Sequence, residues 1–559
     1  MTVRAGVRRR VSSNRCTHEV LEEKLVVQLD QTEADCPSTP HEEVEYKSSS
    51  PRRASSDDDD APYEVSASIS PVEIHLSSPH SHSHSHSNSN SNSSSGRQSI
   101  SGPVQPIQYP LTRCKPDIIQ ADLDQLYFDR IHPIAPFLHQ QRYFSWVEIE
   151  SPSLGRLCLR SAIRTVAAAM SAQFRSLAGR LYNETLAFLQ QLGTLERSPS
   201  IEQIQALLLL AHYEVLQMEA SRAMVTAGRC FRLIQLSRLH DTDVRGSEAT
   251  PSPSSPGLNE ILIAAEERRR TFWVAYCFDR FLSSRNDWPL TLQEDMIHIR
   301  LPLPEPTFQT TTPSPPPQQP PTLLEALSTS SFHHLHSPFT ETILLATLLG
   351  RSMTLRRQTL ILAPTDAPSF WKRHKSLSAL IEKRTQLLAR NLPSPSALVD
   401  PMLAFTHFLA RAVVIYTAEI TQVVPWGGDE ERVLGRAYVG RAIGAAREAA
   451  RLGFAVRPVN CFKAHPFLPV AISRAAGFLA ANTVVPEWEW GNQHLQGNRE
   501  VEELMAVLRD LEAVNGLARE GLRELQARMN VDGNGTVARI GAGLEISSAP
   551  GRSFQGGLY

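Results

Sequence analysis

The spacing of apolar residues divides the chain into helical segments and polar connections. Across residues 116–301, apolar side chains recur every three or four positions, which is the spacing of one face of an α-helix. The pattern is clearest in residues 201–218, 223–234 and 261–282. No segment shows the sustained alternation at every second position that a half-buried strand shows. We therefore expect an all-α fold.

Helical spacing returns after a proline-rich interval. Residues 302–322 include Pro313 and the proline run 315–317, and consecutive prolines favour an extended segment because they lack the amide hydrogen that a helix needs. The helical pattern resumes in residues 339–356, 369–389, 401–423, 432–452, 466–481 and 500–529. The expected organisation is a head at 1–115, a helical block at 116–302, a Pro/Ser/Thr-rich loop at 303–335, a second helical block at 336–530 and a flexible tail at 531–559.

The head has the composition of a mostly disordered chain. Residues 57–60 are four aspartates, and residues 77–95 are almost entirely Ser, His and Asn, which cannot bury a core. The alternating histidines between 80 and 86 fit either a weak metal site or a low-complexity repeat, and we favour the repeat. Residues 20–31 carry leucines at i, i+4 and i+8, which indicates a short amphipathic helix that is not stable alone.

The charge balance restricts where nucleic acid can bind. The chain has 56 basic and 58 acidic residues and a net charge of −2, so it has no overall attraction to DNA or to a membrane surface. No unbroken apolar run approaches the roughly 18 residues of a membrane span. A DNA contact must therefore come from a local basic patch. Arg8, Arg9 and Arg10 fit a nuclear-localisation or DNA-contacting patch, or alternatively a mitochondrial presequence.

The cysteines and the short motifs argue against an enzyme. Seven cysteines lie far apart, with no CxxC pair, so neither a disulfide framework nor a zinc knuckle is indicated. The phosphate-binding, dinucleotide-binding, nucleophile-elbow and zinc-protease motifs are all missing from the sequence. We expect a non-enzymatic protein of a reducing intracellular compartment, without a catalytic site or an evident cofactor.

Three motifs occur in order in the first helical block. The first, in residues 126–144, combines an aromatic pair with two prolines and two histidines: Tyr127, Phe128, His132, Pro133, Pro136 and His139. The second, in residues 228–241, runs from Gly228 to Leu239 and His240. The third, in residues 266–302, contains Glu267, Arg268, Arg269, Arg270, Trp273, Asp279, Arg280, Pro289 and Leu290.

In this order the motifs resemble the fungal-specific transcription factor domain, which is the regulatory domain of binuclear zinc-cluster transcription factors. The resemblance covers residues 117–480. It implies a nuclear regulator of RNA polymerase II-dependent genes, in a metabolic pathway or a biosynthetic gene cluster. It also implies as partners promoter DNA, reached directly or through a partner, a homodimer or a heterodimer with a zinc-cluster factor, a coactivator or corepressor, and a small-molecule effector.

The arginine triplet can be interpreted in two ways. Clustered arginines can neutralise phosphates, or Arg268, Arg269 and Arg270 can pair with nearby glutamates and fix helix positions. Adjacent helical residues point in different directions, so at most two of the three share a face. We favour buried pairing, and we expect Asp279 and Arg280 to join the same network. The histidines of the motifs and Trp273 are expected to be structural.

The resemblance also implies a part that this sequence does not show. Such regulators usually carry six cysteines in two close triplets that bind two zinc ions, whereas the first hundred residues here contain only Cys16 and Cys36. Either the module was lost, or the gene model begins late, or the protein acts without touching DNA. Zinc is expected only if an N-terminal cysteine cluster is missing from the gene model. The alternative function is a non-DNA-binding helical co-regulator or a ligand-binding protein derived from such a factor.

Overall fold

The computed structural model describes most of the chain beyond residue 117. The described ranges are 118–147, 151–195, 198–243, 258–310, 319–328, 335–361, 366–391, 397–424, 428–457, 460–482 and 492–532. Their regular structure is helical, apart from one isolated antiparallel bridge between Arg300 and Thr322, which confirms the all-α prediction. The head at 1–115, with its arginine patch and leucine-rich stretch, and the tail beyond Asp532 lie outside the described residues.

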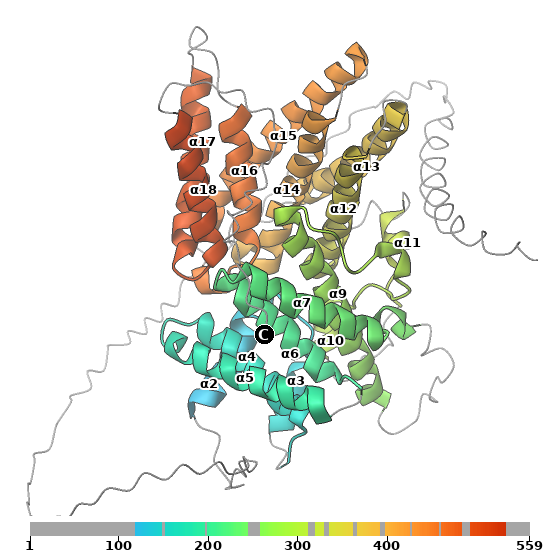
Figure 1. The fold of residues 1–559 in the computed structure, drawn as a ribbon, viewed down its shortest axis with the longest axis vertical. Helices are drawn as coiled ribbons and strands as arrows, with labels where there is room; N and C mark the ends of the chain where they lie inside the picture. Colours follow the sequence, from blue (N-terminus) through green and yellow to red (C-terminus); the bar gives the residue numbers. More distant parts are fainter. Residues whose placement is uncertain are drawn as a thin grey trace, which may run out of the picture. The chain divides into compact units, whose positions relative to one another are not determined.

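A first group of helices packs around α4. It comprises α2 (Ile118–Arg130), α3 (Gln140–Val147), α4 (Leu154–Ala169), α5 (Arg175–Leu195), α6 (Ile201–Leu216) and α7 (Ala220–Leu236). Helix α4 contacts α2, α5 and α6, and α6 also contacts α7 (Figure 1). Helix α6 begins where the Ser200 hydroxyl accepts a hydrogen bond from the Gln203 amide, which satisfies one of the free amides of its first turn. The apolar face predicted for residues 201–218 is buried in this group.

Helix α9 (Leu258–Asn286) joins the first group to the rest of the fold. It contacts α6 and α7 on one side and α12 (Pro338–Thr359) on the other. From residue 270 to residue 284 every side chain of α9 is buried. A helix that is buried on all faces must find protein partners for each polar group that it carries. The polar side chains of α9 therefore determine which neighbouring segments can pack against it.

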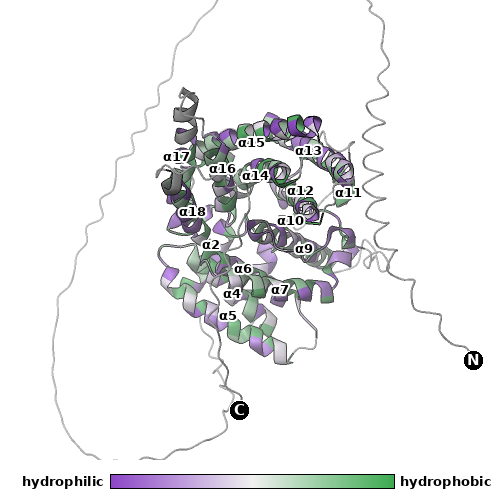
Figure 2. Cartoon of the chain, turned by 45° about the horizontal axis from the view of Figure 1, so that its top comes forward, coloured by the Kyte–Doolittle hydropathy of each residue, from purple (hydrophilic) through white to green (hydrophobic). Residues whose placement is uncertain are grey.

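A second group packs around α14, which runs from Pro401 to Val423. The other members are α12, α13 (Ala367–Arg390), α15 (Asp429–Val456), α16 (Leu468–Asn482), α17 (Asn492–Glu512) and α18 (Gly516–Asp532). Helix α14 contacts α12, α13, α15 and α16, and α14 and α16 are mostly apolar (Figure 2). Among the described helices, α14 is the one long and apolar enough to cross a membrane, but 83% of that stretch is buried in the protein. Its neighbours identify it as a core helix.

The structure differs from the sequence-based expectation in two places. The stretch 500–529 forms two helices, because the chain turns at Asn515, whose side chain accepts from the Leu517 amide and donates to the Pro466 carbonyl. The expected loop at 303–335 contains two short helices, α10 (Glu305–Gln309) and α11 (Leu323–Leu327). Helix α11 begins with a capping box formed by Thr322 and Glu325. Short 3₁₀ turns occupy Leu239–Asp241 (η1), Glu294–Met296 (η2), Ala397–Val399 (η5) and Cys461–Lys463 (η6).

The close approach of α18 to the end of α6 yields a testable prediction. A Cβ atom at Gly516 would lie 2.8 Å from the Met218 amide nitrogen and 2.9 Å from the Leu216 carbonyl oxygen. We expect Gly516→Ala to lower the free energy of unfolding by about 1–3 kcal/mol, the usual cost of overpacking. At Gly444 of α15 nothing lies within 4 Å of such a Cβ atom, so Gly444→Ala should stabilise by about 0.5–1 kcal/mol through helix propensity. Urea unfolding measures both, and equal effects of the two changes would contradict the prediction.

Candidate functional site

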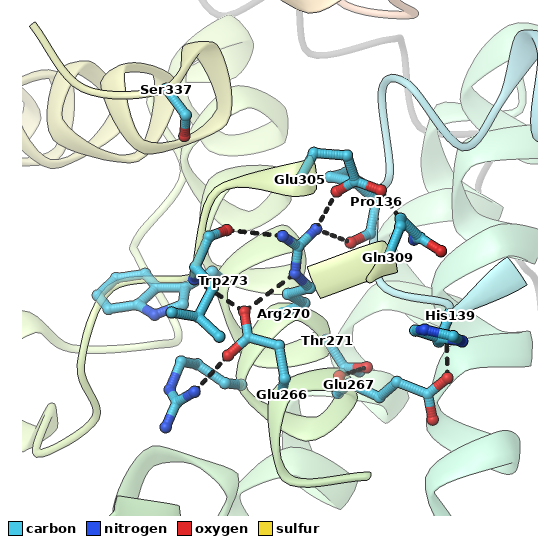
Figure 3. Close-up of polar contacts among 12 residues, drawn as sticks. Pro136, His139, Glu266, Glu267, Arg270, Thr271, Trp273, Glu305, Gln309 and Ser337 are labelled. Carbon is cyan, nitrogen blue, oxygen red and sulfur yellow. Dashed lines mark hydrogen bonds and ion pairs between the residues drawn. The ribbon is translucent and has the colours of Figure 1, made fainter. Parts of the chain in front are cut away.

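The third motif forms a buried ion-pair network at the start of the enclosed part of α9. Glu266, Glu267, Arg269 and Arg270 occupy little more than one helical turn, so their side chains point to different neighbours. Figure 3 shows Arg270 at the centre of this cluster, between Glu266 of its own helix and groups from two other segments. The side chains of Arg270 and Glu266 are 1% and 3% exposed. A charged pair this well excluded from water is tolerated only when hydrogen bonds replace the lost solvent.

Arg270 has a hydrogen-bond acceptor on each of its three nitrogens. Its Nε donates to Glu266 Oε1 at 3.0 Å, and its Nη2 donates to the Leu303 carbonyl at 2.7 Å. Its Nη1 donates to the Pro136 carbonyl at 2.7 Å and to Glu305 Oε2. The fixed fork of the guanidinium group therefore positions three chain segments at once: the helix itself, the turn between α2 and α3, and the start of α10.

Glu266 and Arg269 extend the network to the chain beyond α7. Glu266 Oε1 also accepts from the Leu303 amide at 2.9 Å, and Glu266 Oε2 accepts from Arg269 Nη1. Arg269 Nη2 donates in turn to Asp243 Oδ1, and Asp243 Oδ2 accepts from the Arg300 amide at 2.6 Å. The Arg300 carbonyl accepts from Trp273 Nε1 at 2.8 Å. Residues 300–303 are thus tied to α9 by side chains from two successive turns.

Glu267 faces the first motif. Its Oε1 accepts from the His139 amide at 2.9 Å, and its Oε2 accepts from Arg142 Nη1. Arg142 also binds Glu260 through Nε. Burial raises the pKa of Glu267 to about 7, although Arg142 and the His139 amide lower it. The Nδ1 atom of His139 accepts from the Arg142 amide at 3.2 Å, whereas its buried Nε2 has no hydrogen-bond partner in the described part of the chain.

Glu305 is a part of the network that the sequence reasoning missed. It lies in the segment expected to be a solvated loop, and it binds His132 Nε2 at 2.8 Å, Gln309 Nε2 at 2.8 Å and Arg270. Burial would raise the pKa of Glu305, but the hydrogen bond from His132, the charge of Arg270 and the bond from Gln309 lower it to about 2. Glu305 is the single charged residue of the stretch 302–322. A single charged residue in a Pro/Thr-rich stretch is the feature of the sequence that could have identified it.

The three arginines of the triplet have different surroundings. Arg269 and Arg270 turn inward to carboxylates, and Arg268 is exposed, without a side-chain partner among the described residues. Phosphate binding by the whole triplet is therefore excluded by the geometry of Arg269 and Arg270. The ring of Trp273 is fully buried.

Asp279 and Arg280 form a separate cluster, so the expectation that they join the Glu266 network was wrong. Asp279 accepts from the amides of Thr291 and Leu292 at 3.0 Å, and Arg280 Nη2 donates to the Leu292 carbonyl at 2.6 Å. Two to three turns of α9 separate this pair from Arg270, which is too far for contact. The pair holds the chain that follows α9, and burial raises the pKa of Asp279 although Arg280 and the two amides oppose this.

The remaining motif residues lie in the core or at turns. Tyr127 and Phe128 are buried in edge-to-face contact at 5.1 Å between ring centroids. Pro133 and Pro136 belong to the turn after α2, whose Pro136 carbonyl binds Arg270. The second motif and the end of the third contribute Gly228 on α7, Leu239 and His240 in η1, and Pro289 and Leu290 after α9. A Cβ atom at Gly228 would meet nothing within 4 Å, so no steric reason for glycine exists there.

The charged groups of this site are paired with one another, so their evident role is to hold chain segments in place. Each carboxylate of the network accepts from an arginine. Burial raises the pKa of the Cys158 thiol to about 12 and that of the buried Cys230 and Cys277 thiols still further, which makes the three poor nucleophiles at neutral pH. Within the described ranges no three His, Cys, Asp or Glu side chains gather as a metal site would require. The arrangement can hold segments together and transmit a displacement of one to another.

Removing Arg270 tests the network against its exposed neighbour. We expect Arg270→Ala to lower the free energy of unfolding by about 3–5 kcal/mol, because it leaves buried carboxylates and carbonyls unpaired. Arg268→Ala removes the same charge from the adjacent helical position and should change stability by less than about 0.5 kcal/mol. Chemical denaturation of both variants is the measurement. Similar losses would show that Arg270 contributes no more than an exposed residue.

The raised pKa of Glu267 predicts a pH dependence of stability. Between its usual pKa of 4.5 in the unfolded chain and about 7 in the folded protein, the folded state binds the proton more tightly, so stability declines as pH rises through this window. Glu267→Gln mimics the protonated side chain. We expect the stability of the native protein relative to this variant to fall by about 2 kcal/mol from pH 5 to pH 8. Urea unfolding across this range gives the difference, and a difference that does not change with pH would contradict a raised pKa.

Comparisons with known proteins match this region. The fungal specific transcription factor domain matches residues 125–391, which include the whole network. The chain is 54% identical over 323 residues to transcription factor AN6788 of Emericella nidulans, covering 57% of this chain and 48% of that protein. It is 39% identical to the asperfuranone cluster transcription factor afoA of the same species, covering 74% of this chain and 65% of that protein. It is 34% identical to the pigment biosynthesis transcriptional activator pigB of Monascus ruber, covering 74% and 75%.

The chain therefore spans between about half and two thirds of the length of the first two relatives. No solved structure matches it. The domain match and the similarity to pigB, which extends over about three quarters of both chains, lead to the same assignment. The chain belongs to the fungal-specific transcription factor domain family.

Proposed function

We propose that this protein is a nuclear regulator of RNA polymerase II-dependent transcription and that it controls a biosynthetic gene cluster. The observation that carries the proposal is its extended similarity to proteins named as regulators of such clusters. The asperfuranone factor and the pigment activator each match 74% of this chain, and a sorbicillinoid cluster factor of Penicillium rubens matches 77%. These matches are far longer than a DNA-binding motif, which supports a shared regulatory domain.

The geometry of the domain supports a regulatory role over a catalytic one. The buried charged groups of the motif network are paired with one another, and they position helices and loops. We propose that this all-α domain restrains or relays activation. The helical blocks at 116–302 and 336–530 would act as one regulatory domain, because α9 contacts α6 and α7 on one side and α12 on the other. The head at 1–115 and the tail at 531–559 would supply contacts outside it.

The proposed partners follow from this role. Promoter DNA is reached either directly or through a second protein, in a homodimer or in a heterodimer with a zinc-cluster factor. A coactivator or corepressor would receive the signal, and a small-molecule effector would modulate it. A non-DNA-binding co-regulator remains the alternative form of the proposal, and the same experiment distinguishes the two.

Chromatin immunoprecipitation with sequencing tests the proposal on the tagged full chain in its host fungus. We expect enrichment at the promoters of one biosynthetic gene cluster and loss of that cluster's transcripts when the gene is deleted. Enrichment that disappears when a zinc-cluster partner is deleted would identify the co-regulator form. Nuclear exclusion of the tagged protein, or no enrichment together with unchanged transcripts, would overturn the proposal.

A further inference from the structure

Helix α13 presents a line of polar residues with four cations to the solvent. Besides Pro368 and Ala389, its exposed residues are three or four positions apart and so lie on one face: Ser369, Lys372, Lys375, Ala379, Lys383, Gln386 and Arg390. We call the four cations among them, Lys372, Lys375, Lys383 and Arg390, the α13 basic stripe. Figure 2 shows hydrophilic residues along this helix.

The opposite face of α13 fixes the stripe in place. Phe370, Leu377 and Leu388 are buried against the core, and α13 packs on α12 and α14. Arg384 pairs with Glu341 of α12, its Nε donating to Glu341 Oε2 at 2.7 Å, and both side chains are at most 2% exposed. A helix anchored by a buried ion pair and by apolar contacts holds its outer charges in a constant arrangement.

The charges of the stripe are not neutralised by the protein. The chain has seven lysines. Four are described, and three of these lie on the stripe; the fourth, Lys463, is paired with Asp129 at 2.6 Å. No side chain in the described ranges forms an ion pair or a hydrogen bond with the cationic groups of the stripe. The one acidic residue of α13, Glu382, is paired with Arg441 at 2.5 Å.

The length of the stripe decides which polyanion fits it. From residue 372 to residue 390 an α-helix rises about 27 Å. The acidic run at residues 57–60 spans at most about 14 Å when fully extended, so it cannot reach all four cations. Duplex DNA carries a charge about every 1.7 Å along its axis, and it matches the whole stripe. Lysine, serine and glutamine side chains are typical phosphate contacts.

The residues between the cations exclude two other ligands. The stripe contains no aromatic side chain, on which the bases of a single strand would stack. It contains no large apolar side chain either, which an amphipathic acidic peptide would need as an anchor. We infer that the α13 basic stripe binds the phosphate backbone of duplex DNA independently of sequence. The choice of DNA among polyanions rests on the proposed function.

The inference predicts a measurable salt dependence. With about four phosphates neutralised, the logarithm of the association constant should fall with the logarithm of the salt concentration with a slope of about −4, so affinity weakens roughly 100-fold between 50 and 200 mM salt. Fluorescence anisotropy of the purified full chain with a labelled duplex of random sequence measures it. We expect Lys372→Gln, Lys375→Gln and Lys383→Gln combined to reduce the slope by about 3 and the affinity by roughly tenfold or more.

Two further variants show whether a loss of binding comes from the stripe itself, from the lower net charge or from misfolding. Arg180→Gln, Arg268→Gln and Arg523→Gln combined remove three charges from exposed positions on three other helices and should leave the slope within about one of the native value. Replacing the three stripe lysines by arginine should retain binding, and circular dichroism verifies the helical content of each variant.

Four outcomes would overturn the inference. The first three are that the glutamine variant binds DNA like the native protein, that the scattered control loses as much affinity, and that polyglutamate competes as effectively as duplex DNA at equal charge. The third would assign the stripe to an acidic protein partner. The fourth, a duplex RNA arm that binds more tightly than DNA, would assign it to RNA. None of these results bears on promoter enrichment in the cell, so failure of the stripe and failure of the proposed function are distinguishable.

Discussion

An arginine that is removed from water must find an acceptor for nearly every hydrogen that it carries, and the motif region of this protein is organised around that requirement. Arg270 meets it with the Glu266 carboxylate, with the Pro136 and Leu303 carbonyls, and with Glu305. A displacement of any of these groups removes an acceptor from a buried guanidinium group, which costs free energy. The same solution joins α2 to α4, where Arg164 binds both Asp124 oxygens at 2.8 Å. It also joins α12 to α13 through Glu341 and Arg384. Buried ion pairs thus recur at three helix contacts of the fold.

The position of α9 explains why the third motif begins on it and why residues of the other segments contact it. Its first buried turns hold the turn after α2 and the segment 300–305, and its later turns hold residues 291–292 through Asp279 and Arg280. Its far side packs on α12, where Tyr276 bonds Thr347 at 3.1 Å and where a Cβ atom at Gly350 would lie 3.3 Å from Arg280 Nε. A displacement of α9 would therefore be felt by both groups of helices. This is the geometry that a domain needs if it is to relay a signal between a ligand or partner on one side and a partner on the other.

The sequence predicted those features that depend on residues close together in the chain. The helix at 401–423 was predicted to the residue, because its apolar spacing, the Asp400 cap and Pro401 at its first position act locally. The turn at Asn515 was missed because its carbonyl partner on Pro466 lies 49 residues away. Glu305 was missed for the same reason, being 35 residues from Arg270 in a segment whose prolines indicated only a loop. The sequence favoured buried pairing for the arginine triplet, but only the fold shows that Arg269 and Arg270 form these pairs and that Arg268 faces outward. For the α13 basic stripe, the periodicity of the sequence predicts the helix. It does not show which of its cations form no ion pair, because ion pairing depends on the neighbouring helices.

The separation of Arg270 from its acceptors in the chain also affects the order in which the protein can assemble. A ribosome completes α9 before it adds Leu303 and Glu305, so the nascent helix has Arg270 and Glu266 in place while the segment that supplies two acceptors of Arg270 is still missing. The acceptors of Arg270 are therefore complete only after the start of α10 has been synthesised. A fragment ending at residue 302 would contain all three sequence motifs and still lack two acceptors of its central arginine. The shortest stretch of chain that supplies every acceptor of Arg270 extends past the last recognisable motif, into a segment whose sequence resembles a linker.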